Sequence, residues 1–293
     1  MIEIIISISL VLGITRLWVL HWYFALFMQA FFNHRFMTHR QFKMSQDWEI
    51  FFYMLSFVAQ GAGYLSMRAY VILHRAHHAH SDEERDPHSP RYLLTITSLI
   101  WNMGKRHKLF REYGLDLPAE QEEKIINKLD DKTKDWLEKS TPFNPAIFNN
   151  LPEASALDTF FDLRWCRFAW MMLWAIPYLF TCLAIWFFGL WPGLYALCLF
   201  YPTHLLMIPI QGTLVNWFGH SKGSKNFDNN DDSTNAYFLN WFLWGEENQN
   251  NHHHAPARPN FAFKKTERDV IYYIMLILKK YGIIEMKPVE NNL

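Results

Sequence analysis

Long apolar stretches separated by polar segments run along the chain. The clearest of them extends from Phe168 to Gly219 and holds no Asp, Glu, Lys or Arg. It is long enough for two membrane spans of roughly 20 residues each. Gly189–Gly193 supplies the glycines and proline typical of a tight turn between two such spans. The pattern therefore predicts a transmembrane hairpin over residues 164–220.

The N-terminal segment from Ile2 to Asn33 is also mostly apolar. As a helix rising about 1.5 Å per residue it reaches roughly 45–50 Å, which is ample for one span and short for two. We expect one span over Leu17–Phe32 and a second, short or re-entrant helix over Ile4–Leu12. The segment lacks the basic start and the small-residue cleavage site of a signal peptide.

A weaker apolar stretch, Phe51–Leu73, is interrupted by Gln60, two glycines and Arg68. We interpret it as one helix that lies at the membrane interface rather than crossing the bilayer. A single crossing there would place the histidine clusters on its two sides on opposite faces of the membrane.

Polar segments of the chain carry two amphipathic patterns. Within Lys105–Asp158, the stretch Glu120–Lys139 places apolar residues among charges and predicts a solvated helix. Arg268–Lys280 predicts a final amphipathic helix, whereas Asn226–Asn235 is rich in Asn and Asp and predicts a loop.

Basic residues flank the predicted hairpin. Arg164 and Arg167 precede it, and Lys222 and Lys225 follow it. By the positive-inside rule both ends of the hairpin face the cytoplasm. The patterns together predict an all-α, multi-pass integral membrane protein whose histidine clusters lie on the cytoplasmic face.

Composition supports a membrane setting and excludes some functions. The chain holds 13 Trp and 25 Phe, and aromatic residues of this kind suit membrane interfaces. The formal net charge is zero, so no basic surplus is available for nucleic acid. Cys166, Cys182 and Cys198 are too widely spaced for a zinc or iron–sulfur motif, and we interpret them as buried small hydrophobes.

Fourteen histidines are present, and most of them fall in short clusters. On a helix, positions i, i+3 and i+4 point into one arc of about 100°. This spacing occurs at residues 74, 77 and 78 and again at 249, 252 and 253, while residues 216 and 220 are i and i+4. The groups are His34 with His39; His74 with His77 and His78; Asn216 with His220; and Gln249 with His252 and His253.

The clustered histidines predict two metal ions. Eight convergent imidazoles exceed the needs of one ion, and positions beyond the four that zinc usually takes favour redox iron. His34 and His39 are five residues apart and diverge by about 140° on a regular helix, so we expect the helix to end between them. The Glu-x-x-His pattern of soluble carboxylate-bridged di-iron bundles does not occur.

Acidic residues near the clusters have two interpretations. Asp82, Asp86 and Glu246 either orient imidazoles through hydrogen bonds or are ordinary loop acids. The remaining histidines are interpreted as structural or solvated. We expect His21 and His204 to be packed core residues, and His80, His88, His107 and His254 to face solvent.

The clusters and their order resemble the membrane fatty acid desaturase family, in its acyl-CoA (stearoyl-type, delta-9-like) branch. The motifs are HRFMTHR at 34–40, HRAHHAHSDEERDPHSP at 74–90, LVNWFGH at 214–220 and GEENQNNHHHAP at 245–256. The resemblance runs from about Gly13 to Phe263. It implies transmembrane helices with a cytosolic helical cap, two iron ions, and O2-dependent introduction of a cis double bond into a long acyl chain.

The resemblance also implies a ligand set and a layout. One desaturase domain would fill 1–293: membrane helix or helices at 1–33, two histidine boxes at 34–163, the hairpin at 164–220, and the third box with the last helix at 221–293. Asn216 would hold a water on one iron. The implied iron ligands are His34, His39, His74, His77, His78, His220, His252 and His253.

Two departures from the family pattern affect expectations. Gln249 stands where the third box normally begins with histidine, and an amide oxygen is a weaker ligand than imidazole. Ile72 and Leu73 stand where animal acyl-CoA desaturases carry an Arg-Asp pair that grips coenzyme A. Lys105 and Arg106 are therefore the candidate head-group residues, and CoA, acyl carrier protein and phospholipid all stay open as carriers.

Other functions compete with desaturation. The chain has no flavin, haem or iron–sulfur motif, so electrons are expected from a separate ferredoxin or cytochrome. A related membrane hydroxylase would use similar histidines and is separated by product analysis. A metal transporter would need ionisable residues along its spans, where the hairpin holds only His204. A non-enzymatic lipid-binding protein leaves the clusters unexplained. The predicted hairpin and Phe51–Leu73 are candidate walls for an acyl tunnel.

Overall fold

The computed structural model describes residues 2–60, 66–84, 86–93, 95–113, 160–161, 164–188, 198–199 and 202–286. Two predicted features lie outside these residues. They are the solvated helix at Glu120–Lys139 and the hairpin turn at Gly189–Gly193.

The chain begins with one long helix, α1 (Ile2–Phe27), which continues without a break into the π-helix η1 (Met28–Thr38). The expectation of separate helices over Ile4–Leu12 and Leu17–Phe32 is therefore wrong. No proline interrupts this segment, so nothing in the sequence forces a second helix. Within the described residues, Ile4–Thr38 is the one helix long and apolar enough to cross a membrane.

Two helices replace the single helix expected over Phe51–Leu73. They are α2 (Gln46–Gln60) and α3 (Met67–Ala79), and the second of them carries the second histidine box. Gly61 and Gly63 lie between them in the sequence, and glycine is a poor helix former. A short antiparallel pair joins β1 (Phe42–Lys43) to β2 (Glu285–Met286), with Phe42 opposite Met286.

The predicted hairpin is described in part. Its first arm is α9 (Arg164–Phe188), which packs along α1 through a cluster that includes Ile14 and Tyr178. Its other described helices are α11 (Met207–Thr213) and the π-helix η3 (Leu214–Phe218). Cys166 and Cys182 are buried as predicted, but Cys198 is exposed.

The rest of the described chain forms a cap around the histidine clusters. It contains α4 (Ile96–Tyr113), the 3-10 helix η4 (Tyr237–Leu239), α12 (Asn240–Leu243), α13 (Gln249–His254) and α14 (Val270–Lys280). The final helix was predicted from residue 268. It begins at 270 because the Asp269 side chain caps it by accepting a hydrogen bond from the Tyr272 amide at 2.9 Å.

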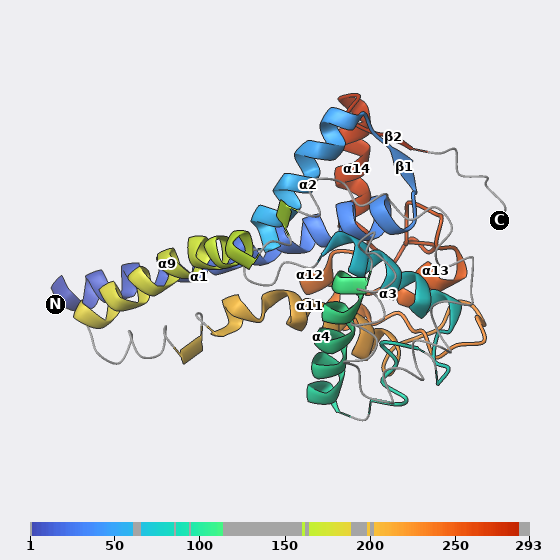
Figure 1. The fold of residues 1–293 in the computed structure, drawn as a ribbon, viewed down its shortest axis with the longest axis horizontal. Coiled ribbons are helices and arrows are strands. Elements are labelled where there is room, and N and C mark those ends of the chain that lie inside the picture. The colour runs from blue at the N-terminus through green and yellow to red at the C-terminus, as the bar shows by residue number, and fades with distance from the viewer. Residues whose placement is uncertain are drawn as a thin grey trace.

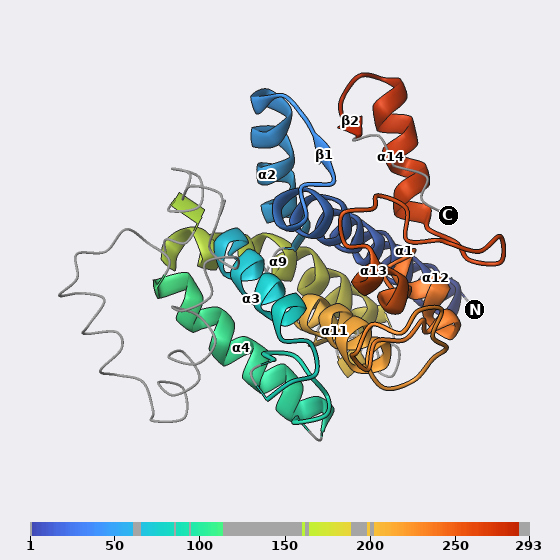
Figure 2. The same cartoon turned by 90° about the vertical axis from the view of Figure 1, so that its right-hand side faces the viewer.

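The α1–α9 pair projects from one end of the molecule, and the cap lies at the other end (Figure 1). Viewed toward the cap, α2, α4 and α14 lie around this pair (Figure 2). A core of aromatic residues joins η1 to α2 and α14, with Phe31 and Phe32 of η1 packed on Phe52. η1 therefore supports the cap from its centre, and the histidines of the first box lie on this same segment.

Candidate metal centre

The structure gathers the eight histidines of the predicted ligand set into two neighbouring groups. In each group the ring nitrogens that could bind a metal lie within 4.8 Å of one another. The five-histidine group is His34, His39, His74, His78 and His252, and the three-histidine group is His77, His220 and His253.

The five-histidine group forms a chain of contacts between Nε2 atoms. His252 Nε2 lies 3.0 Å from that of His34 and 2.9 Å from that of His78. His74 Nε2 lies 3.0 Å from the Nε2 atoms of both His78 and His39. Five ring nitrogens from three separate segments therefore point at one small volume.

A π turn brings His34 and His39 together. The His39 amide donates to the His34 carbonyl at 3.1 Å, an i to i+5 bond that defines π winding. The Thr38 hydroxyl reinforces it by donating to the Asn33 carbonyl at 2.9 Å. The helix ends between the two histidines as expected, at Thr38, with His39 at its C-cap, but its π winding was not predicted. The helix winds more loosely there, and residues five apart then share a face.

Each helical histidine box divides its rings between the two groups. On α3, His74 and His78 join the five-histidine group, whereas His77 joins the other. On α13, His252 and His253 divide in the same way. An arc of about 100° is therefore wide enough to serve two adjacent positions rather than one.

Every ring of the three-histidine group is bonded to a carboxylate. His77 Nδ1 lies 2.9 Å from Asp86, and His220 Nδ1 lies 2.7 Å from Asp82. His253 Nδ1 lies 2.8 Å from Asp231. Sequence reasoning missed Asp231, because its loop carries only generic Asn and Asp signals and no spacing to a histidine.

The five-histidine group has a different support. His34 Nδ1 lies 2.6 Å from Glu246, whose other oxygen accepts from Arg35 at 2.9 Å. Arg35 also donates to Asp269 at 3.1 Å and is fully buried. Sequence reasoning missed Arg35, since a basic residue inside a histidine box carries no signal that it is buried between two acids.

Burial keeps four rings of the five-histidine group unprotonated. Desolvation and the neighbouring imidazoles hold the pKa of His39, His74, His78 and His252 well below the usual value. The rings are therefore neutral at physiological pH, which is the form that binds metals.

The carboxylates of the three-histidine group stay charged. Burial raises the pKa of Asp86, but its attraction to His77 outweighs burial and the pKa falls below its usual range. Asp231 behaves in the same way through its hydrogen bond from His253. Ionised acids at Nδ1 fix each ring with Nε2 directed away from the acid.

The donor set fits bound metal ions. The Nε2 atoms of His77, His220 and His253 are buried and meet no hydrogen-bonding partner within the part of the chain that the structure describes. A metal ion would give these nitrogens a partner. In the five-histidine group the Nε2 atoms lie about 3 Å apart, where the lone pairs of neutral rings repel unless a cation lies between them. Nitrogens at right angles around a metal at about 2.1 Å are separated by about 3.0 Å.

The comparison with known protein families decides the identity of this arrangement. The family model described as "Fatty acid desaturase" matches residues 9–271, which is most of the chain. The chain belongs to the fatty acid desaturase family.

Curated relatives carry related names. "Delta-9 desaturase-like 4 protein" of Arabidopsis thaliana is 27% identical over 255 residues, covering 87% of this chain and 69% of the relative. "Hex-5-enoyl-[acyl-carrier protein] acetylenase" of Moorena producens (strain JHB) is 24% identical over 261 residues, covering 86% and 69%. "Delta-9 acyl-lipid desaturase 1" of Arabidopsis thaliana is 24% identical over 250 residues, covering 85% and 67%. The chain is thus an oxidoreductase of the delta-9-like desaturase type, from a membrane-associated family.

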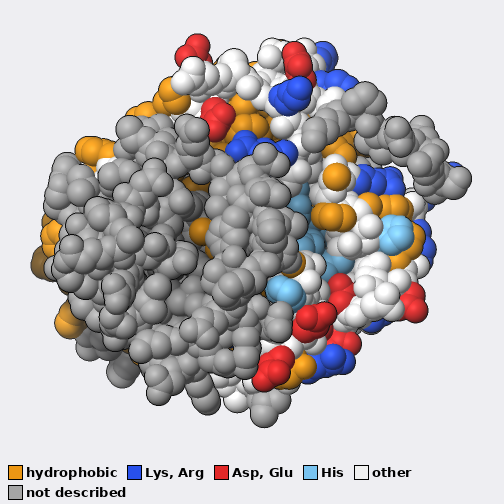
Figure 3. Space-filling view, turned by 45° about the vertical axis from the view of Figure 1, so that its right-hand side comes forward, with side chains coloured by type: hydrophobic (Ala, Val, Ile, Leu, Met, Phe, Trp, Pro, Cys, Tyr) orange, Lys and Arg blue, Asp and Glu red, His pale blue; other side chains and the backbone are white. Residues whose placement is uncertain are grey.

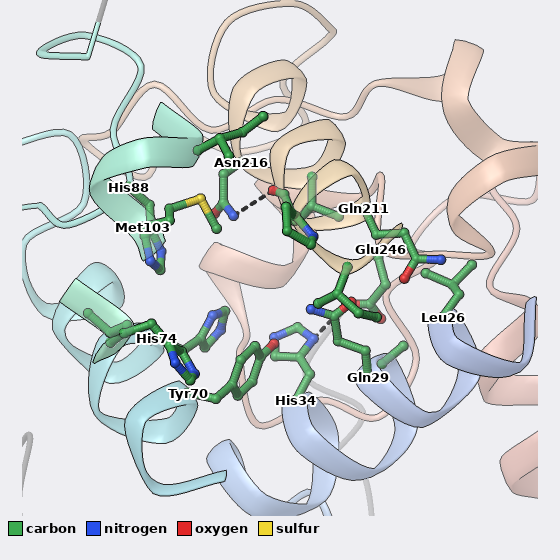
Figure 4. Close-up of a pocket in the computed structure, with 18 of the residues that line it drawn as sticks. Leu26, Gln29, His34, Tyr70, His74, His88, Met103, Gln211, Asn216 and Glu246 are labelled. Atoms are coloured by element: carbon green, nitrogen blue, oxygen red, sulfur yellow. Dashed lines mark hydrogen bonds and ion pairs between the residues drawn. The ribbon is translucent and has the colours of Figure 1, made fainter. Parts of the chain in front are cut away.

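A cavity opens directly onto the histidines of this desaturase (Figure 4). Leu26 of α1 and Gln29 of η1 lie on one side of it, and Met103 of α4 and His88 lie on the other (Figure 4). Its wall includes Tyr70 and Leu73 of α3 and residues 208–216, but no residue of α2. The predicted tunnel walls are therefore right for the hairpin and for the end of Phe51–Leu73 only.

Asn216 and Gln249 both line this cavity. The Asn216 side-chain amide donates to the Gly212 carbonyl at 2.7 Å, and the Gln249 amide donates to the Glu246 carbonyl at 2.7 Å. Each nitrogen is thereby engaged by backbone, which leaves the oxygen as the group that can accept a bond or approach a metal.

The candidate head-group residues lie on α4. Lys105 is exposed, with its Nζ 5.5 Å from the centre of the Trp101 ring. Arg106 is partly buried and donates to the Asp86 carbonyl at 3.2 Å. They precede His107, which lines the cavity, by two residues and one residue.

The remaining histidines follow the predictions with exceptions. His21 and His204 are buried, and His204 stacks on Tyr178 at 4.4 Å, as expected of packed residues. His88 was expected in solvent but is buried in the cavity wall. It follows a turn in which the Asp86 carboxylate accepts a hydrogen bond from the His88 backbone amide at 2.7 Å. His107 likewise lines the cavity, whereas the exposed His254 stacks on Phe227.

Two adjacent aspartates test the supporting carboxylates. Asp231→Asn is expected to lower iron affinity about 10–100-fold, because the amide cannot provide the charge that fixes His253. The matched control is Asp232→Asn, whose carboxylate makes only an exposed pair with Arg91 at 3.0 Å. Metal content after dialysis against a graded chelator measures both. Equal retention of iron in the two variants would show that Asp231 does not support a ligand.

Proposed function

We propose that the protein is an O2-dependent fatty acyl desaturase that introduces a cis double bond into a long acyl chain. The observation that carries this proposal is the pairing of two histidine groups with a largely apolar cavity. His34 and His74 belong to both, so an acyl chain held in the cavity would lie against the metal ligands.

The eight histidines would hold two iron ions, five rings for one and three for the other. Iron suits an all-imidazole donor set with positions to spare. Bound there, the irons would supply the oxidising power to remove hydrogen from an unactivated methylene. In each turnover two hydrogens leave the acyl chain, and two further electrons with two protons complete the reduction of one O2 to two waters.

The residues of this chain would bind and orient the acyl group. Leu26, Leu73 and Met103 provide apolar surface that excludes water from the cavity. The oxygens of Asn216 and Gln249 would hold a water or a weak contact at the edge of the metal centre. Lys105 and Arg106 would contact the head group of the carrier.

The carrier, the electron source and the topology are part of the proposal. The relatives' names mention both acyl lipid and acyl carrier protein, so a lipid and a carrier thioester are the substrates to compare. A separate ferredoxin or cytochrome would deliver the electrons. α1 and the hairpin would make the protein multi-pass, with the metal centre on the cytoplasmic face.

Product analysis tests the reaction. The gene would be expressed in a strain that requires unsaturated fatty acids, and the lipids examined by chain-cleavage mass spectrometry. Growth without supplement and a new double bond at one position are expected. Hydroxylated chains without new double bonds would assign the protein to the related hydroxylases, and unchanged lipids with a fully iron-loaded protein would contradict the proposal.

Gln249 distinguishes a weak contact from a full ligand. Gln249→Ala is expected to keep some iron and some turnover, because the amide oxygen is a poor iron ligand. Gln249→His should bind iron at least as well as the parent. Iron content and product yield measure both. A variant Gln249→Ala that is as inactive and iron-free as His252→Ala would make the glutamine a full ligand.

A further inference from the structure

A short aromatic surface lies beside the long N-terminal helix. Four exposed side chains of η4 and α12 form it, and their exposed fractions run from 39% to 73%. We call it the aromatic patch. Its members are Tyr237, Phe238, Trp241 and Phe242.

Hydrogen bonds fix the level of the patch on α1. Trp22 Nε1 donates to the Phe242 carbonyl at 3.1 Å, and the Tyr23 hydroxyl donates to the Trp241 carbonyl at 2.6 Å. Just before these residues on α1, Leu20 is 70% exposed. The patch therefore lies where α1 passes from an exposed apolar helix into the cap.

Beyond this level α2, α4 and α14 still expose apolar side chains, among them Trp101 and Tyr273, but the box-carrying segments differ. No large hydrophobic side chain is exposed in the described parts of 67–91, 207–236 and 243–272, the segments that carry the second and third boxes. Figure 3 shows acidic and basic side chains spread over the described surface beside the histidines. The box-carrying segments thus present a polar surface around the histidines, and the aromatic patch lies beside the exposed apolar surface of α1.

We propose that the aromatic patch is seated in the interfacial zone of a lipid bilayer and sets the height of the metal centre above it. Tyrosine and tryptophan combine an apolar body with a polar tip and are enriched at this depth. The patch continues the exposed apolar surface of α1, so one bilayer can cover both. This inference rests on the membrane location in the proposed function and not on the reaction.

The backbone of α12 is prepared for a poorly hydrated setting. A four-residue helix leaves its carbonyls without partners inside the helix, and such groups are costly away from water. The carbonyls of Trp241 and Phe242 instead accept bonds from α1 side chains. A helix exposed to water would gain little from this arrangement.

Charge argues against a protein partner at this surface. Residues 236–244 contain no Asp, Glu, Lys or Arg. Surfaces that steer a soluble electron carrier use complementary charges. A lipid interface needs none within the patch, and the Lys222 ammonium, 5.9 Å from the Phe218 ring beside it, can reach the head groups.

The patch also fixes a height. His34 follows Tyr23 by eleven residues on one continuous helix. At the α-helical rise of about 1.5 Å per residue this is at most roughly 16 Å along the axis, because the π-wound part is more compact. With the patch at the interface, the metal ligands stand clear of the bilayer core. An acyl chain must therefore leave the hydrocarbon to reach the cavity.

Spin labels in nanodiscs test the inference on the full-length chain. Single cysteines would replace Phe238, Trp241 and Leu20 in a background in which the three native cysteines are changed to alanine. Glu83 and Asp228, exposed residues of the box-carrying segments, serve as controls. Power saturation compares relaxation by oxygen, which enters lipid, with relaxation by a nickel chelate, which stays in water.

The expected order of depth is Leu20, then the two patch positions, then the controls. Oxygen should relax the patch labels more than nickel, and nickel should dominate at Glu83 and Asp228. Equal nickel access at the patch and the controls would overturn the proposal. Protection of Phe238 and Trp241 that appears only after a ferredoxin or cytochrome is added would assign the patch to a protein. None of these measurements depends on desaturase activity. Failure of the proposed function can therefore be distinguished from failure of the membrane assignment of the patch.

Discussion

His252→Ala is expected to remove iron from the five-histidine position and to abolish desaturation. His252 links two other rings of that group, with its Nε2 3.0 Å from that of His34 and 2.9 Å from that of His78. Its loss removes one donor and breaks the chain of contacts that aligns the others. Product yield should fall by more than about 100-fold, because the proposed reaction uses metal ions at both positions.

A neighbouring histidine supplies the matched control. His254 is exposed and stacks on Phe227 rather than facing the metal groups. His254→Ala should keep two irons per chain and near-normal product yield. Elemental analysis of the purified protein and lipid analysis of expressing cells measure both variants. Full iron content in His252→Ala would remove this residue from the ligand set.

Arg35→Met is expected to be the most destabilising single change in the cap. Arg35 is fully buried between Glu246 and Asp269, and it also donates to the Pro259 carbonyl at 3.0 Å. Removing it leaves two buried carboxylates without their cation, which costs about 3–5 kcal/mol. Iron content should also fall, because Glu246 orients His34.

Arg91→Met is the control, because it removes an arginine from a solvent-exposed ion pair rather than a buried one. Arg91 pairs with Asp232, and their side chains are 55% and 39% exposed. Its loss should change the free energy of unfolding by no more than about 1 kcal/mol. Thermal unfolding in detergent, followed by a thiol-reactive dye, measures both variants. Equal melting temperatures would show that the buried arginine contributes no more than the exposed one.

Histidine spacing predicted which residues come together, but not how they divide between the two histidine groups. The i, i+3, i+4 rule correctly placed His74, His77 and His78 on one side of a helix. It could not show that two metal positions lie side by side within that arc. The five-residue gap between His34 and His39 correctly indicated a helix end between them, but not the π winding of the last turns. Helical wheels assume α winding, and π winding is imposed by packing around the helix rather than by local propensity.

Supporting residues were harder to predict than ligands. Asp82, Asp86 and Glu246 lie close in sequence to a box, which made them candidates. Asp231 and Arg35 are recognised only once distant segments meet in space. The apolar pattern likewise located α9 and the N-terminal helix. It could not show whether the N-terminal segment forms one helix or two, because hydrophobicity alone does not mark a helix boundary where no turn residues interrupt the apolar run.

The acids behind the two histidine groups have a further consequence for redox chemistry. Three carboxylates, those of Asp82, Asp86 and Asp231, stand behind the three-histidine position. Behind the five-histidine position the bonded carboxylate is Glu246, whose charge Arg35 offsets. Negative surroundings favour a trivalent ion over a divalent one. Two iron ions held at these positions would therefore differ in reduction potential, although the histidines that would hold them are chemically alike.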